Sequence, residues 1–182
     1  MVRATVRTLL VFCHPVPDSF GSAVRDACAA ALERHELQSI DLYEGRDLPR
    51  PFADEDGVAL ERAEAVVLVY PTWWGSFPAP LGEWIECALE RDAWRTVSRV
   101  VAVTTHGSSR MVNLLTGGIG ERIIRRGLPR RMAEGAFGRC LALYSMDAID
   151  HPARAAFLEE LPRELEKALA GTVSRRDRSP DR

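Results

Sequence analysis

The sequence predicts one α/β domain built on a doubly wound, five-stranded parallel sheet with the strand order 2-1-3-4-5. The first observation is that continuous apolar runs alternate with amphipathic stretches along most of the chain. Strands that are apolar on both faces are typical of parallel sheets covered by helices on both sides. The second observation is that the strand–helix unit occurs five times without an internal repeat or linker, a rhythm that favours this winding order.

Five apolar runs are the expected strands. They are residues 7–14, 37–43, 65–71, 98–106 and 139–146. The second run alternates in part, whereas the others read as nearly unbroken apolar segments. Runs of this length, bounded by polar or proline-bearing segments, are typical of strands buried in a sheet.

Amphipathic segments follow the strands. The expected helices are residues 21–35, 57–65, 79–92 and 152–170, with a weakly helical segment at 120–134 that Gly127 and Pro129 break. Pro80 is acceptable in the first turn of its helix, and Pro162 is expected to bend the last one. We expect residues 1–171 to form a single domain and residues 172–182, which are polar and rich in arginine, to be a disordered tail.

Composition and charge exclude several classes of protein. The 182 residues are 46% apolar, which suits one globular domain with a sizeable core, and the net charge of −2 gives a nucleic-acid partner no electrostatic support. No segment approaches a membrane span and the first residues lack a signal-peptide pattern, so we expect a cytoplasmic protein without membrane insertion. The four cysteines form no CxxC pair, and no metal-ligating cluster is visible.

Three loops of unusual composition follow strands that the predicted order places side by side. They are residues 14–22 after the first strand, 71–80 after the third and 105–113 after the fourth. In such a sheet, ligands bind beyond the carboxyl ends of the strands, where the winding reverses. We therefore expect the three loops to form one binding site.

The loop after the first strand, HPVPDSFGS, leads into the start of a helix. Free backbone N–H groups and the helix dipole make such a start an anion site. Ser19 adds a hydroxyl donor and His14 adds a ring N–H, which suits a phosphate group. The alternative is that Asp18 or Ser19 simply caps the helix. The loop has neither the G-x-G-x-x-G pattern nor a Walker A motif.

The loop after the third strand, PTWWGSFPAP, combines two tryptophans with a glycine and three prolines. A flat, amphipathic ring ligand needs apolar walls and a few amides at its polar edge. Trp73 and Trp74 supply walls, and Gly75 permits close approach of the backbone. The alternative is that one tryptophan packs beneath the loop and the other marks a dimer contact.

The loop after the fourth strand carries hydroxyls and a histidine. Thr104, Thr105, His106 and Gly107 offer hydroxyls, amides and a ring nitrogen to the polar edge of a planar ring. The alternative for His106 is an ordinary surface histidine. Ser108 does not indicate a serine hydrolase, because the G-x-S-x-G motif is missing. A phosphate site, a flat-ring site and donors along the ring edge together describe a flavin nucleotide.

Three motifs, HPVPDSF, YPTWWGSFPAPLGEWIECAL and TTHG, occur in this order. In order and spacing they resemble the flavodoxin-like NAD(P)H:quinone oxidoreductase family, which includes DT-diaphorase, modulator of drug activity B and the ancillary flavoproteins of potassium efflux. The resemblance covers roughly residues 7–145, and the middle motif is its most specific part. It implies a flavodoxin-like fold and hydride transfer from NAD(P)H through a flavin to quinones or similar acceptors, by a ping-pong mechanism.

The resemblance also implies the residues of a flavin site. Around the phosphate and ribityl chain they are His14, Asp18, Ser19, Phe20 and Gly21; along the ring they are Pro71, Thr72, Trp73, Trp74 and Gly75; along its pyrimidine edge they are Thr104, Thr105, His106 and Gly107. Members of the family are usually homodimers with active sites at the subunit interface. Its short members often use FMN, so we expect an FMN-binding homodimer, with FAD as the alternative cofactor.

This chain departs from the family's pattern at several positions. Gly82 replaces a usual lysine, and His106 replaces a glycine of the T-T-G-G loop. The tyrosine and histidine that assist charge transfer in DT-diaphorase-like enzymes align with Val112 and Gly118. No catalytic residue is therefore assigned, apart from His106 as a donor at the flavin edge. The alternative function is a flavin-binding regulatory subunit with little turnover of its own.

Overall fold

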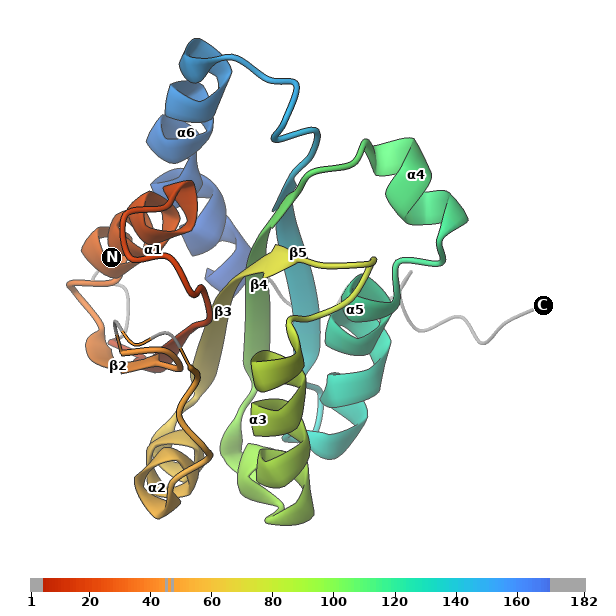
Figure 1. The fold of residues 1–182 in the computed structure, drawn as a ribbon. Helices are drawn as coiled ribbons and strands as arrows, with labels where there is room; N and C mark the ends of the chain where they lie inside the picture. Colours follow the sequence, from red (N-terminus) through yellow and green to blue (C-terminus); the bar gives the residue numbers. More distant parts are fainter. Residues whose placement is uncertain (1–4, 45, 47, 171–182) are drawn as a thin grey trace.

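The computed structural model describes residues 5–44, 46 and 48–170 (Figure 1). The predicted tail, residues 172–182, lies outside the described residues. Among the described helices, none is both long and apolar enough to cross a membrane.

Five parallel strands form one sheet in the order β2-β1-β3-β4-β5, which confirms the predicted topology. The strands are β1 (Arg7–Phe12), β2 (Glu36–Asp41), β3 (Ala65–Thr72), β4 (Arg99–His106) and β5 (Phe137–Leu143). β1, β3 and β4 are buried along nearly their whole length. Their unbroken aliphatic runs are therefore explained by helices on both faces of the sheet.

Helices cover the two faces of the sheet in two groups (Figure 1). α1 (Phe20–Ala31) and α6 (His151–Ala170) pack on one face, whereas α2 (Asp54–Arg62), α3 (Ala79–Glu90) and the segment after α5 (Ile119–Arg122) pack on the other. The predicted apolar face of α3 is confirmed, because Leu81, Trp84, Ile85 and Ala88 are all buried.

The segment between β4 and β5 differs from the prediction. A short helix, α4 (Arg110–Leu115), was not expected, and α5 runs directly into η2 (Ile123–Gly127) and η3 (Leu128–Arg131). The predicted break is observed as a change of helix type, because the π-helix η2 ends at Gly127 and the 3₁₀ helix η3 begins at Leu128, but the chain does not leave helical conformation there. Gly127 has helical φ and ψ, and Pro129 lies in the first turn of η3, where its missing N–H removes no hydrogen bond.

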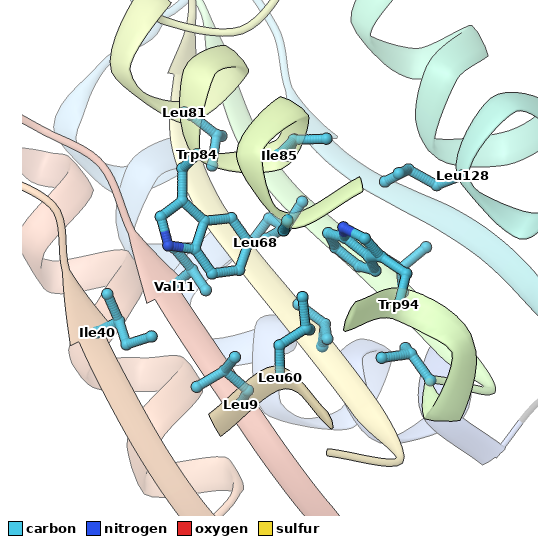
Figure 2. Packing of buried hydrophobic residues seen from close by; sticks show 14 of the residues in the cluster. Leu9, Val11, Ile40, Leu60, Leu68, Leu81, Trp84, Ile85, Trp94 and Leu128 are labelled. Carbon is cyan, nitrogen blue, oxygen red and sulfur yellow. The ribbon is translucent and has the colours of Figure 1, made fainter. Parts of the chain in front are cut away.

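The core beneath α2 and α3 is built around two tryptophans (Figure 2). The rings of Trp84 and Trp94, which lies in the 3₁₀ turn η1 (Ala93–Thr96), meet edge to face with centroids 6.1 Å apart. Trp84 Nε1 donates to Asp56 Oδ2 at 3.1 Å. Arg50 holds both oxygens of the same carboxylate, at 2.9 and 2.7 Å. The buried indole N–H thus has an acceptor, and the buried carboxylate of Asp56 has both a donor and a positive partner. Buried polar and charged groups need such partners, because they have lost their contacts with water.

Candidate functional site

The three unusual loops leave the sheet at one edge. Val11 and Phe12 at the end of β1 pair with Leu68 and Val69 of β3, and the last residues of β3 and β4, Thr72 and His106, pair with each other. The loops that follow these strands lie at the upper end of the sheet in Figure 1. The predicted strand order is therefore sufficient to bring them together.

α1 begins directly after the first loop. Ser19 is its N-cap residue, and the Ser19 hydroxyl accepts a hydrogen bond from Ser22 N at 3.3 Å. Within the described part of the chain, no acceptor takes the backbone N–H groups of Phe20 and Gly21. The positive end of the helix dipole therefore presents two unpaired donors at this edge. Asp18 is exposed beside them.

His14 lies against this helix start. Its Nδ1 atom lies 3.0 Å from Val16 N and 3.2 Å from Val16 O, and when it accepts from Val16 N the neutral ring carries its proton on Nε2. Burial lowers the pKa of His14 below its ordinary value, which favours this neutral form. A Cβ atom at Gly21 would lie 3.0 Å from His14 Cδ2. The glycine thus lets the imidazole approach the helix and add an N–H donor to it.

Residues 73–76 form a tight hairpin turn after β3. Trp73 N donates to Ser76 O at 3.1 Å, and Ser76 N donates to Trp73 O at 3.0 Å. Both central residues, Trp74 and Gly75, have positive φ, at 53° and 75°. Glycine adopts this conformation freely, but a bulky residue there costs about 1–2 kcal/mol. Trp74 is fully exposed, so no burial offsets the strain, and such strain is typical of functional loops.

The end of β4 is tied to β3 by side chains. Thr104 Oγ1 lies 2.7 Å from Thr72 Oγ1, which in turn lies 3.3 Å from His106 Nε2. The His106 ring stacks on Tyr144 with centroids 4.5 Å apart, and His106 is only 5% exposed. The alternative of an ordinary surface histidine is therefore wrong.

The main chain after β4 presents donors to the same edge. His106 O accepts a hydrogen bond from Met146 N at 2.9 Å, and Ser108 O accepts one from Ser145 N at 3.0 Å. These bonds turn the loop's carbonyls toward the segment after β5. Among the described residues, no acceptor takes the N–H groups of Gly107 and Ser108. The loop can therefore donate hydrogen bonds to the carbonyls of a planar ring.

The other predicted site residues, among them Phe20, Pro71 and Thr105, also lie at this edge of the sheet. The ring of Phe20 lies 6.5 Å from that of Phe157 in α6, so Phe20 offers the site only its main chain. Pro71 and Thr105 pair in register and are partly exposed. Of the two tryptophans of the hairpin turn, Trp74 is fully exposed and Trp73 is 42% exposed.

Sequence reasoning missed the polar side chains behind the loop after β4. Asn113 is buried and Glu121 half-buried, and together with His106 they line a small cavity. Their signal in the sequence is weak, because a glutamate in a weakly helical segment normally faces water. Across the described ranges, no group of three or more His, Cys, Asp or Glu side chains could hold a metal ion.

Comparison with known proteins agrees with this architecture. The profile of the flavodoxin-like fold family matches residues 6–167, and a search of curated proteins finds no match. A Streptococcus mutans protein is 19% identical, with 86% of this chain and 97% of that one covered and a TM-score of 0.73. An NAD(P)H:quinone oxidoreductase from Methanothermobacter marburgensis is 19% identical, with 94% and 99% covered and a TM-score of 0.69.

A third solved structure is that of an enzyme with a bound cofactor. It is an FMN-dependent NADH-azoreductase from Bacillus anthracis in complex with FMN, 11% identical, with 90% of this chain and 99% of that one covered and a TM-score of 0.65. At such identities the likeness establishes a shared fold, and the family profile spans most of the chain. The chain therefore belongs to the flavodoxin-like fold family.

Proposed function

We propose that this chain is an FMN-dependent NAD(P)H oxidoreductase that passes two electrons to a quinone or a similar aromatic acceptor. One observation carries the proposal: unpaired backbone donors at the start of α1 and after β4 lie on either side of a strained, exposed tryptophan turn. Two solved structures of the same fold support it by their names, a quinone oxidoreductase and an FMN-dependent azoreductase.

The start of α1 has the donors that a phosphate monoester needs. The N–H groups of Phe20 and Gly21, the Ser19 hydroxyl and the His14 ring N–H are all neutral donors at the positive end of a helix. Asp18 is exposed, where solvent and salt screen its charge. Because this is a single set of amides, it suits FMN, which has one phosphate; FAD is the alternative.

The other two loops suit the ring. The indoles of Trp73 and Trp74 can cover an aromatic face, and the N–H groups of Gly107 and Ser108 can bind carbonyls at its polar edge. When bound, the flavin accepts a hydride and later releases two electrons, while the protein positions and tunes it. Donors at the polar edge stabilise negative charge that appears there on reduction. Since both substrates would use the same ring face, we expect ping-pong kinetics.

We also propose that two copies of the chain pair beside this site. An apolar patch of side chains, each more than half exposed, consists of Trp74, Met111, Leu114, Leu115 and Ile119. The patch is continuous with the hairpin turn, because Gly120 N in α5 donates to Gly75 O at 3.2 Å. Contiguous exposed apolar surface of this kind marks interaction sites. A second copy would cover the patch and complete the wall that the tryptophans begin.

The dimer proposal is tested by mass in solution. Sedimentation should give a dimer for the wild type and a monomer for Leu115→Glu, since the charge would be buried in the interface. Val58→Glu on α2, also an exposed apolar position, is the matched control and should remain dimeric. A wild-type protein that stays monomeric at micromolar concentration contradicts the proposal.

The redox proposal is tested by identifying the chromophore and its reactions. The purified protein should be yellow, and denaturation should release FMN, identified by mass. Anaerobic NADH or NADPH should bleach the flavin, and benzoquinone should restore its colour over many turnovers. Bleaching without turnover would favour the alternative, a regulatory flavoprotein. A colourless protein that gains no thermal stability from FMN or FAD would reject both.

A further inference from the structure

The imidazole of His106 is buried with one of its two nitrogens unsatisfied. Nε2 lies 3.3 Å from Thr72 Oγ1, but Nδ1 has no hydrogen-bond partner among the described residues. A buried polar atom left without a partner destabilises the folded state, because it has lost its hydrogen bonds to water. In native proteins such atoms are usually paired with protein or with ordered water. The missing partner of Nδ1 therefore needs an explanation.

A cavity beside the imidazole offers one. The space open to the centre of a water molecule there is about 10 Å³. Its lining includes five polar residues, which is more than the number of hydrogen-bond partners that one water needs. They are Thr72, Thr104, His106, Asn113 and Glu121. A buried water requires roughly 10–15 Å³ of such space and two to four polar partners. The cavity meets both requirements for a single water and is too small for a ligand.

We propose that this cavity holds one water molecule that links His106 Nδ1 to Glu121, so that the imidazole can gain or lose a proton while it stays buried. The hydrogen bonds run in one consistent direction. In the neutral ring, Nε2–H donates to Thr72 Oγ1 and Thr72 O–H donates to Thr104 Oγ1, while Nδ1 accepts a hydrogen bond from the water, which also donates to the Glu121 carboxylate. When the ring becomes doubly protonated, the added proton reaches Nδ1 through the water, and the two hydroxyls keep their direction. The distances of 2.7 and 3.3 Å allow this arrangement.

The charges around the imidazole set its resting state. Burial lowers the pKa of His106, and the nearby Glu121 carboxylate partly opposes this, so the ring is neutral at pH 7. The titratable and charged groups that face this cluster are Tyr70 from β3, Glu121 from α5, Arg125 from η2, Cys140 from β5, Tyr144 after β5 and Arg110 from α4. Glu121 Oε1 also lies 2.7 Å from Arg125 Nε, an ion pair that connects the carboxylate to the surface.

This arrangement gives His106 a role in the proposed redox reaction, on which the following step rests. A hydride passed from NAD(P)H to a bound flavin would bring two electrons and one proton, and would add one negative charge to the site. His106 then takes one further proton from solvent by way of Glu121 and the water, and becomes an imidazolium. Two electrons and two protons are thus taken up, and no net charge is added to the buried site. His106 acts as a buried proton acceptor and does not need to touch the flavin.

The water and the proton path are tested first on the protein without cofactor. A crystal structure that shows ordered waters should contain one between His106 Nδ1 and Glu121. In ¹⁵N NMR, Glu121→Gln should lower the pKa of His106, because the opposing carboxylate is lost. Glu164→Gln, which breaks another helical ion pair far from His106, is the matched control and should leave it unchanged. A dry cavity, or a His106 pKa that ignores Glu121→Gln, overturns the proposal.

The redox consequence is tested by the midpoint potential of bound flavin as a function of pH. One proton taken up with two electrons contributes about 30 mV per pH unit. The slope near neutral pH should therefore fall by about 30 mV per pH unit in His106→Gln relative to the wild type. An equal slope in both proteins overturns this role. If no flavin binds, the proposed function fails instead, and the cofactor-free experiments still decide whether the water path exists.

Discussion

Two pairs of tryptophans occupy opposite environments in this molecule. Trp84 and Trp94 are 2% and 0% exposed, whereas Trp73 and Trp74 are 42% and 100% exposed. The buried pair lies on regular or 3₁₀ structure with a satisfied indole N–H at Trp84. The exposed pair lies on a turn that holds one of them at positive φ. The same residue type thus stabilises the fold at one place and is kept available, at a cost in strain, at the other.

The difference follows from what precedes each pair in the chain. Trp84 lies one helical turn from Leu81 and Ala88 on the buried face of α3, so continuing the helix buries it. Trp73 follows a strand that has already reached the edge of the sheet, and the next two residues reverse the chain. Among the described residues, the indole of Trp74 is left uncovered and that of Trp73 is only partly covered. Our proposals supply the missing cover for these rings, which is a bound ligand or a second copy of the chain.

The largest effect is expected from truncating the buried pair. Trp84→Ala should lower the free energy of unfolding by about 3–5 kcal/mol, because it opens a large cavity and removes a donor from buried Asp56. Chemical denaturation measures this. Trp74→Ala is the control and should change stability by less than about 0.5 kcal/mol. Equal losses in the two variants would contradict the contrast between the pairs.

The fold could be predicted because its signals are local and repeated. Unbroken aliphatic strands and the spacing of Leu81, Trp84, Ile85 and Ala88 indicate burial without knowledge of any partner. The segment between β4 and β5 was harder. Its short helices have weak periodicity, and at Gly127 and Pro129 the chain changes from a π-helix to a 3₁₀ helix while both residues keep helical positions. There, tertiary packing overrides local preference.

The candidate site could be predicted at the level of loops but not of side chains. Strand order alone brings the loops of residues 14–22, 71–80 and 105–113 to one edge. The burial of His106 depends on its stacking with Tyr144 and on its pairing with Thr72, two contacts far apart in sequence. The proximity of Glu121 depends on how the chain crosses back after α4. Such contacts leave no pattern in a single sequence.

The second prediction concerns the turn itself. Gly75→Ala should destabilise the protein by about 1–2 kcal/mol, since φ at this position is 75° and a Cβ would lie 3.3 Å from Thr116 Oγ1. Gly82→Ala in α3 is the matched control. Nothing lies within 4 Å of a Cβ there, and the helix interior favours alanine, so it should stabilise by about 0.5–1 kcal/mol. Thermal unfolding of both variants gives the comparison.

The third prediction concerns pH, to which histidines in the region of the exposed pair should respond. Burial lowers the pKa of both His14 and His106 below the ordinary value of 6.5. The unfolded chain therefore binds more protons than the folded one once pH drops below about 6.5, and stability should be lost progressively from there downward. Denaturation curves measured at successive pH values give the unfolding free energy as a function of pH. This free energy should depend less on pH in His106→Gln than in the wild type. An unchanged pH dependence would mean that His106 is not buried as described.

The smallest effect on stability is expected where the strain is greatest. Trp74→Gly relieves positive φ at a fully exposed site, and glycine's loss of chain entropy on folding, about 0.5–1 kcal/mol, nearly cancels the gain. Unfolding free energy should therefore change by less than about 1 kcal/mol. Flavin affinity, in contrast, should fall by about tenfold, the value of one aromatic contact. Trp73→Phe, which keeps an aromatic ring at φ below zero, should bind flavin with nearly wild-type affinity. If Trp74→Gly clearly stabilises the protein and leaves flavin titrations unchanged, the strained indole serves the subunit interface instead, and only sedimentation should respond.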